Sequence, residues 1–226
     1  MKILMVLTSH AELGDSGHKT GFWLEEFAAP YYVFKDAGAN LTLASPAGGQ
    51  PPIDPNSEGD DAQTDATRRF AQDPEAKAAL SNTQKLADID VADFDAVFYP
   101  GGHGPLYDLV DDADSLGLIK SAVTHGKIVS AVCHAPAVFL KAETESGDPL
   151  LKGRQVTAFS NSEEEAVGLA EVVPFLLEDE VQKLGASYHR ASDWASKVVV
   201  DGRLITGQNP ASSAATAEAV VQALKS

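Results

Sequence analysis

Three near-continuous apolar runs limit what this chain can fold into. They are KILMVLT (2–8), FDAVFYP (94–100) and KIVSAV (127–132). Such runs, with little polar alternation, are typical of strands that are covered by helices on both faces of a parallel sheet. A further strand is predicted at 40–46, and the segment 22–38 before it predicts a helix ending at Gly38. This opening strand–helix–strand unit predicts a parallel sheet with right-handed crossovers.

The remaining segments continue this alternation. Helical patterns occur in parts of 61–86, within about 112–125, in two pieces on either side of Pro174, and from Pro210 to Leu224. We therefore predict an α/β fold, a three-layer α/β/α sandwich with a mostly parallel, flavodoxin-like sheet. The whole chain, 1–226, is interpreted as one domain, with an insertion of loops and helices expected at about 47–90.

Two local features refine this prediction. KVVVDGRLITG predicts a hairpin, because Asp201-Gly202 is a favourable turn between two apolar runs. Pro30 lies inside the first predicted helix, and a proline there removes a backbone donor and predicts a kink or a break.

Charge and composition exclude several classes of function. The chain has 33 acidic and 17 basic residues, a formal net charge of −16, and 44% of its residues are hydrophobic. A surface this acidic repels phosphate backbones and anionic lipids, so we expect neither nucleic-acid nor membrane binding. A single cysteine excludes an intramolecular disulfide. No segment is typical of a signal peptide or a membrane span, and we expect a cytoplasmic protein.

That single cysteine, Cys133, is the strongest candidate for chemistry. An apolar strand ends at it, and a helix that begins with Pro136 is predicted directly afterwards. Backbone N–H groups and the dipole at a helix N-terminus favour a thiolate. The carboxyl ends of strands in an open α/β sheet are also where ligands bind. The alternative is an inert, buried thiol, the usual fate of a free cysteine.

Two neighbouring features could complete a site around this thiol. His134 can face Cys133 only if the chain forms an irregular, strained elbow; otherwise it is a capping or solvent-facing histidine. Gly101-Gly102-His103-Gly104 follows another strand, and its backbone N–H groups could bind an oxyanion. The loop could equally be a tight turn, with His103 exposed rather than lining a pocket.

Carboxylates are the remaining candidates. Glu25 and Glu26 lie on the otherwise apolar first helix, so one of them could be buried and protonated, although the residues alone do not choose between them. The acidic runs 163–165 and 178–180 are expected to be solvated helix faces. The histidines have no metal-ligand spacing, and no cofactor motif is present, so no metal and no cofactor are expected.

Taken together, these segments resemble the ThiJ/PfpI superfamily, within the class I glutamine-amidotransferase-like fold. The closest resemblance is to its glutathione-independent glyoxalase (glyoxalase III) and heat-inducible chaperone branch. The matching pieces, in family order over nearly the whole chain, are Lys19-Thr20-Gly21 followed by Glu26, FYPGGHGPLYDL (98–109), AVCHAPA (131–137) and DGRLITGQNPASS (201–213).

The resemblance implies roles for particular residues. Cys133 would be the nucleophile and His134 its partner. Glu26, rather than Glu25, would be the buried acid, and Glu164 the third member of the catalytic triad. The oxyanion donors would be the backbone N–H groups of Gly102 and His134, with Gly101 and His103 lining the same pocket.

The resemblance also implies a reaction and a setting. The enzyme would be a cofactor-independent lyase of the D-lactate dehydratase type. It would convert methylglyoxal and similar 2-oxoaldehydes to 2-hydroxy acids, as a cytoplasmic homodimer that detoxifies methylglyoxal in the stress response. Four alternatives stay open: repair of glycated side chains (deglycase), a holdase chaperone, a redox sensor, and a cysteine peptidase or amidase.

Overall fold

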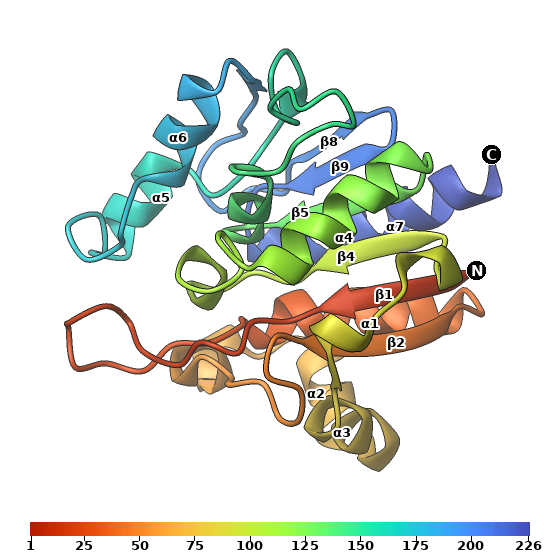
Figure 1. Ribbon diagram of the computed structural model, residues 1–226. Helices are drawn as coiled ribbons and strands as arrows, with labels where there is room; N and C mark the ends of the chain where they lie inside the picture. Colours follow the sequence, from red (N-terminus) through yellow and green to blue (C-terminus); the bar gives the residue numbers. More distant parts are fainter.

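The computed structural model describes all residues, 1–226, and consists of a central sheet with helices on both faces (Figure 1). The sheet has seven strands in the order β3-β2-β1-β4-β5-β9-β8. They are β1 (Lys2–Val6), β2 (Asn40–Ser45), β3 (Gln84–Lys85), β4 (Ala96–Tyr99), β5 (Ile128–Val132), β8 (Val198–Asp201) and β9 (Leu204–Gly207). All neighbours pair in parallel except β8 and β9, which form the predicted hairpin. The mostly parallel, flavodoxin-like sheet is therefore confirmed.

Alternate residues of the strands supply two separate apolar cores. Ile3 and Met5 of β1 belong to the core beneath α1 (Leu24–Asp36) and α7 (Ser213–Lys225). Leu4 and Val6 belong to the core on the opposite face, beneath α4 (Ala113–Thr124). Figure 1 shows α4 on one face of the sheet and α1 and α7 on the other. Burial on both faces explains why the strands have continuous apolar runs, and it produces the three layers.

The segment 47–90, predicted to be an insertion, carries polar helices and leads into an edge strand. Its helices are η1 (Pro55–Glu58), η2 (Asp60–Ala62), α2 (Asp65–Ala71), α3 (Pro74–Ser81) and η3 (Leu86–Asp88). Phe70 of α2 and Leu80 of α3 are buried in the same core as α1. The β3 edge strand between α3 and η3 pairs in parallel with β2. This segment therefore extends the sheet as well as covering one side of it.

The remaining elements lie after η3. The short helices are η4 (Val91–Asp93), η5 (Gly104–Leu106), η6 (Ala135–Phe139), α5 (Asn161–Ala166), α6 (Leu177–Lys183) and η7 (Pro210–Ser212). A separate small sheet pairs β6 (Gln155–Val156) with β7 (Ser187–Tyr188). Of the kink or break predicted at Pro30, the break does not occur, since α1 continues through this buried residue from Leu24 to Asp36. Packing against the sheet and α7 outweighs the loss of one backbone donor.

The parallel strands give the molecule two distinct edges. Their carboxyl ends meet at the edge on the left of Figure 1, and both chain termini lie at the opposite edge. No helix is both long and apolar enough to cross a membrane.

Candidate active site

Cys133 lies on a strained elbow at the carboxyl end of β5. Its φ is +62°, and Trp194 is the only other non-glycine residue with a positive φ. The Cys133 N–H donates to the carbonyl of Gly207 at 2.9 Å, and its carbonyl accepts from the N–H of Phe159 at 2.8 Å. Left-handed backbone at such a residue persists only where its surroundings hold it in place. These two hydrogen bonds hold Cys133 in the left-handed conformation.

The elbow brings His134 against the thiol. Cys133 Sγ lies 3.3 Å from His134 Nδ1, and His134 Nε2 lies 2.5 Å from Oε2 of Glu164. All three side chains are buried. Since an ionised Glu164 can only accept, the Nε2 nitrogen carries the proton and the Nδ1 lone pair faces the sulfur. This is the tautomer that can accept a proton from the thiol.

The other oxygen of the Glu164 carboxylate binds His103. Glu164 Oε1 lies 2.7 Å from His103 Nε2, and the two imidazole rings are 4.0 Å apart between centroids. Glu164 belongs to the first turn of α5, which Ser160 caps. His103, which could have been an exposed loop residue, is buried. One carboxylate therefore orients two imidazoles from different loops.

Glu26 approaches the thiol from the side of α1. Its side chain is fully buried, and neither carboxyl oxygen has a hydrogen-bond partner of good geometry. Burial raises its pKa to about 8, although the Cys133 thiol and the backbone N–H groups of Gly101 and Gly102 oppose the shift. Glu26 is thus a neutral acid near pH 7. The adjacent Glu25 is half-buried and accepts a hydrogen bond from Thr64 at 2.5 Å.

The glycines of the GGHG loop are required by close approach. A Cβ on Gly101 would lie 2.4 Å from Oε2 of Glu26 and 2.5 Å from the carbonyl of Val132. Gly102 has φ +91°, and a Cβ there would lie 2.5 Å from the carbonyl of Gly21. The Gly102 N–H is near enough to Cys133 to lower the pKa of the thiol. Neither this N–H nor that of His134 donates to a backbone acceptor.

The expectation that a helix N-terminus favours a Cys133 thiolate is wrong. Burial, followed by the nearby carboxyl of Glu26, raises the pKa of the thiol well above its ordinary value. The helix after the elbow is η6, a 3₁₀ segment of five residues. Its short dipole does not offset the loss of solvation. The resting sulfur is therefore a thiol, which needs a base.

His134 and Glu164 have the protonation states that such a base requires. Burial, and then the neighbouring His103, lowers the pKa of His134 even though Glu164 opposes this shift. Burial would raise the pKa of Glu164, but the charges and hydrogen bonds of the two histidines bring it below its ordinary value. At neutral pH the imidazole is therefore neutral and the carboxylate ionised.

Two connected hollows open beside this cluster. The first, which we call the mouth, has a volume of about 560 Å³, and its lining includes His103, Leu13 and Val167. The second, the outer groove, has a volume of about 670 Å³, and its lining includes Trp194. Trp23, Pro55 and Asn56 line both, so the outer groove extends the mouth.

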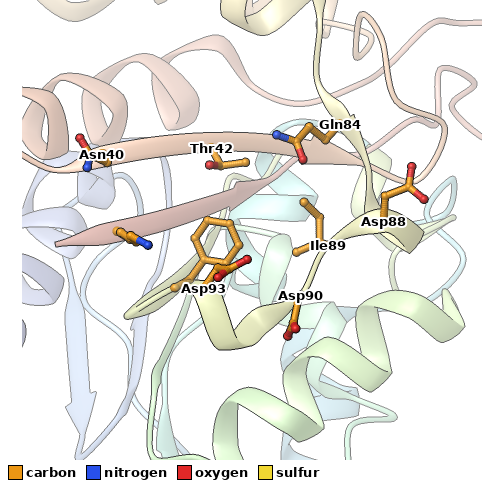
Figure 2. A pocket seen from close by; sticks show the side chains of 9 residues that line it. Asn40, Thr42, Gln84, Asp88, Ile89, Asp90 and Asp93 are labelled. Carbon is orange, nitrogen blue, oxygen red and sulfur yellow. The ribbon is translucent and has the colours of Figure 1, made fainter.

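A separate polar cavity of about 380 Å³ is lined by residues of β1, β2 and β3 and of the segment 88–94 (Figure 2). Asn40, Thr42 and Gln84 line it together with Asp88 and Asp90. It contains none of the candidate catalytic residues.

Only one group of side chains brings three potential metal ligands together. His103, His134 and Glu164 each place a ligand atom within 4.8 Å of the others. Both imidazole Nε2 atoms already lie at hydrogen-bonding distance from the carboxylate. A hydrogen-bonded relay accounts for the arrangement without an ion.

The structure thus brings Glu26, Cys133, His134 and Glu164 together with the GGHG loop, but it corrects one expectation about the acidic run 163–165. Glu163 and Glu164 are buried rather than solvated, and only Glu165 is exposed. Phe159 was not predicted to be near the site, yet its ring packs against His134 in a tilted arrangement with centroids 4.2 Å apart. No local pattern marks it, because its partner is distant in the sequence.

A three-layer α/β sandwich with a cysteine on a strand-to-helix elbow defines a class of proteins with a nucleophile elbow. Within that class, the family model of the DJ-1/PfpI family matches residues 19–223, and the chain belongs to this family. The resemblance predicted from the motifs is therefore confirmed.

Similar proteins include enzymes and solved structures. Glyoxalase 3 of Candida albicans is 33% identical, over 100% of this chain and 99% of its own length. Glutathione-independent glyoxalase HSP31 of Saccharomyces cerevisiae is 30% identical, over 99% and 98%. The crystal structure of glyoxalase III from Candida albicans superposes with a TM-score of 0.92 at 33% identity, covering 99% of this chain and 97% of that one. The Rapid Encystment Protein of Francisella tularensis superposes with a TM-score of 0.93 at 38% identity, covering 99% and 98%.

Proposed function

We propose that this protein is a glutathione-independent glyoxalase, which converts methylglyoxal and related 2-oxoaldehydes to 2-hydroxy acids. The observation that carries the proposal is the fully buried, neutral Glu26 beside the Cys133 thiol. A hydrolase needs only the Cys133–His134–Glu164 relay, whereas an internal redox also needs an acid that can return as a base. Full-length relatives named as glyoxalases support the same assignment.

The first step forms a hemithioacetal. His134 Nδ1, 3.3 Å from the sulfur, takes the thiol proton, and the ionised Glu164 stabilises the resulting imidazolium. The Cys133 sulfur then forms a bond to the aldehyde carbon. The aldehyde oxygen gains a proton from Glu26, which becomes a carboxylate.

The second step moves a proton between two carbons. The Glu26 carboxylate removes the C–H proton of the former aldehyde carbon while the His134 imidazolium gives its proton to the ketone oxygen, which leaves an enediol on the sulfur and a neutral His134. Glu26 then delivers its proton to the neighbouring carbon and takes up the hydroxyl proton of the former aldehyde carbon, so that it is again a neutral acid. The aldehyde carbon is oxidised to an acyl thioester while the ketone carbon is reduced to an alcohol. No external electron donor or acceptor is needed.

Water completes the reaction by cleaving the lactoyl thioester. His134 removes a proton from the water, and the thiolate leaves and is reprotonated. The N–H groups of Gly102 and His134, which donate to no backbone acceptor, stabilise the oxyanion that forms. Methylglyoxal and one water give one lactate and one proton, so the atoms and charges balance.

The decisive experiment supplies purified protein with methylglyoxal in the absence of glutathione and measures lactate. Wild-type protein should form lactate, and Cys133→Ser protein should form none. Absence of lactate from the wild type would refute the proposal.

We also propose that the protein works as a cytoplasmic homodimer that binds neither nucleic acid nor membranes. The net charge of −16 supports the lack of affinity for polyanions. Light scattering coupled to size exclusion should give twice the mass of one chain, and a monomer would contradict the assignment.

A further inference from the structure

Trp194 combines backbone strain with exposure. It lies in a turn closed by a hydrogen bond from Ala195 N–H to the carbonyl of Ser192, with φ +63°, a conformation that turns normally give to glycine. Its side chain is nevertheless 47% exposed. Packing in the core therefore does not explain why a tryptophan occupies this strained position. Backbone strain of this kind is found most often at ligand-binding and active sites.

The buried carboxylate of Glu163, which the proposed reaction does not use, holds this turn. Its Oε1 accepts from the backbone N–H of Trp194 at 2.9 Å and from Asn209 Nδ2 at 2.8 Å. Its Oε2 accepts from Gln208 Nε2 at 3.1 Å, and from the backbone N–H and hydroxyl of Ser160 at 3.0 and 2.9 Å. All five donors converge on one side chain, and Asn209 Nδ2 also donates to the carbonyl of Ala195 at 2.9 Å.

Trp194, in the turn that Glu163 holds in place, lies between the catalytic cluster and the outer groove. Its ring packs edge-on against Phe159 at 5.9 Å between centroids, and the Phe159 ring in turn packs, tilted, against His134 at 4.2 Å. Trp194 also lines the outer groove, together with Trp23, which lines the mouth as well. The three exposed large hydrophobic residues are Val167, Trp194 and Val200, and the first two line these hollows. Exposed apolar surface is thus concentrated around the entrance.

We propose that Trp194 is a specificity-determining residue that contacts the substituent of the 2-oxoaldehyde and favours an aryl group over methyl, and that Glu163 is the residue that positions it. This inference rests on the proposed function. Hollows of about 560 and 670 Å³ exceed what a methyl group fills, and Trp194 lines the larger one, the outer groove. Asp60 and Asp61 in the outer groove disfavour anionic substituents, so the aryl group is uncharged.

The first test compares kcat/KM for phenylglyoxal with kcat/KM for methylglyoxal. Trp194→Ala should lower the phenylglyoxal-to-methylglyoxal ratio about tenfold, since one aromatic contact contributes about that factor. Trp194→Phe should keep most of the ratio. Val200→Ala is the matched control, because Val200 is also an exposed apolar residue but does not line either hollow, and it should leave the ratio unchanged. An unaltered ratio in Trp194→Ala would overturn the inference.

The second test replaces the positioning group. Glu163→Gln removes one acceptor oxygen and turns an NH₂ group toward existing donors, so the turn should lose its left-handed conformation. The substrate ratio should fall as in Trp194→Ala, mainly through KM for phenylglyoxal. If the folded variant keeps the wild-type ratio, Glu163 has only a structural role.

A binding measurement separates this inference from the proposed function. Acetophenone carries the aryl group but has no aldehyde, and its affinity for Cys133→Ser protein can be measured by NMR titration. Acetophenone should bind more tightly than acetone, and adding Trp194→Ala should remove most of that preference. Equal binding of both ketones would refute the aryl site even if methylglyoxal is converted. Aryl preference without any turnover would instead refute only the glyoxalase proposal.

Discussion

Two adjacent glutamates on α1 have opposite environments. Glu26 is fully buried beside Cys133, whereas Glu25 is half-buried and accepts a hydrogen bond from Thr64. The same helix thus provides a candidate catalytic acid, Glu26, and a matched control residue, Glu25.

Glu26→Gln should lower the turnover of methylglyoxal by about 10²–10⁴-fold, the usual contribution of general acid–base catalysis. The amide has nearly the shape of the protonated acid, so the far-ultraviolet circular dichroism should stay the same. Glu25→Gln should retain turnover within a few-fold. Equal activity of the two variants would remove Glu26 from the mechanism.

The raised pKa of Glu26 also makes stability depend on pH. The carboxyl has an ordinary pKa of 4.5, which burial raises to about 8 in the folded protein. Between these values the folded state binds a proton that the unfolded state has released. The stabilisation is therefore complete below about pH 4.5, decreases as pH rises, and is lost once pH passes 8.

Urea unfolding at pH 5, 6.5 and 8 tests this dependence. Relative to Glu26→Gln, the wild type should lose up to about 1.4 kcal/mol in the free energy of unfolding per pH unit. The difference between the two proteins isolates Glu26 from the other titrating groups. Parallel pH dependences would show that this carboxyl is already ionised in the folded protein.

At the scale of elements, two glycines have different surroundings. Replacing each of them by alanine should therefore change the free energy of unfolding in opposite directions. At Gly101 the new Cβ would lie 2.4 Å from Glu26 Oε2 and 3.0 Å from the Cβ of Cys133. At Gly117, an exposed position within α4, it would meet nothing within 4 Å.

Gly101→Ala should destabilise the protein by about 1–3 kcal/mol and abolish most turnover, because the GGHG loop must shift. Gly117→Ala should stabilise it by about 0.5–1 kcal/mol with normal turnover, because alanine favours the helix. Both values can be obtained from urea unfolding. A Gly101→Ala enzyme with full activity would show that the loop adapts without cost.

The helices and strands were predictable because each of them arises from a local pattern of apolar residues or of turn residues. Continuous apolar runs became β1, β4 and β5, and the hairpin of β8 and β9 followed from its turn. The side-chain environments were less predictable, since they depend on segments far apart in the chain. His103 meets Glu164 across 61 positions, and Glu163 meets Asn209 across 46. The sequence alone therefore does not distinguish a solvated run of acidic residues from a run that contains a buried carboxylate with five hydrogen-bond donors.

The protonation state of the Cys133 thiol was not predictable from the sequence for the same reason. Its position at a strand end indicated a reactive cysteine, but its pKa depends on Glu26, more than 100 positions earlier. The strand-to-helix elbow follows from local sequence, whereas the electrostatics of Cys133 follow from the packing of α1.

For the whole molecule, the formal net charge of −16 predicts a dependence of stability on salt. Like charges repel one another most in the compact state, and salt screens that repulsion as the Debye length falls from about 30 Å at 0.01 M to about 8 Å at 0.15 M. The thermal midpoint at pH 7.5 should therefore rise with NaCl over this range, as differential scanning fluorimetry can measure.

The control is the same titration near pH 5, where protonation of carboxylates lowers the net charge and the rise should be smaller. A midpoint that falls with salt at pH 7.5 would mean that exposed ion pairs, such as Arg69 with Asp36, outweigh the repulsion.

Both chain termini lie at the edge of the sheet opposite the carboxyl ends of the parallel strands (Figure 1). A purification tag, a fluorescent fusion or a surface linker attached to either end would therefore project away from the entrance. The protein can be immobilised on a support through its first or last residue with the entrance facing the solution. This arrangement suits a flow reactor or a biosensor for reactive aldehydes.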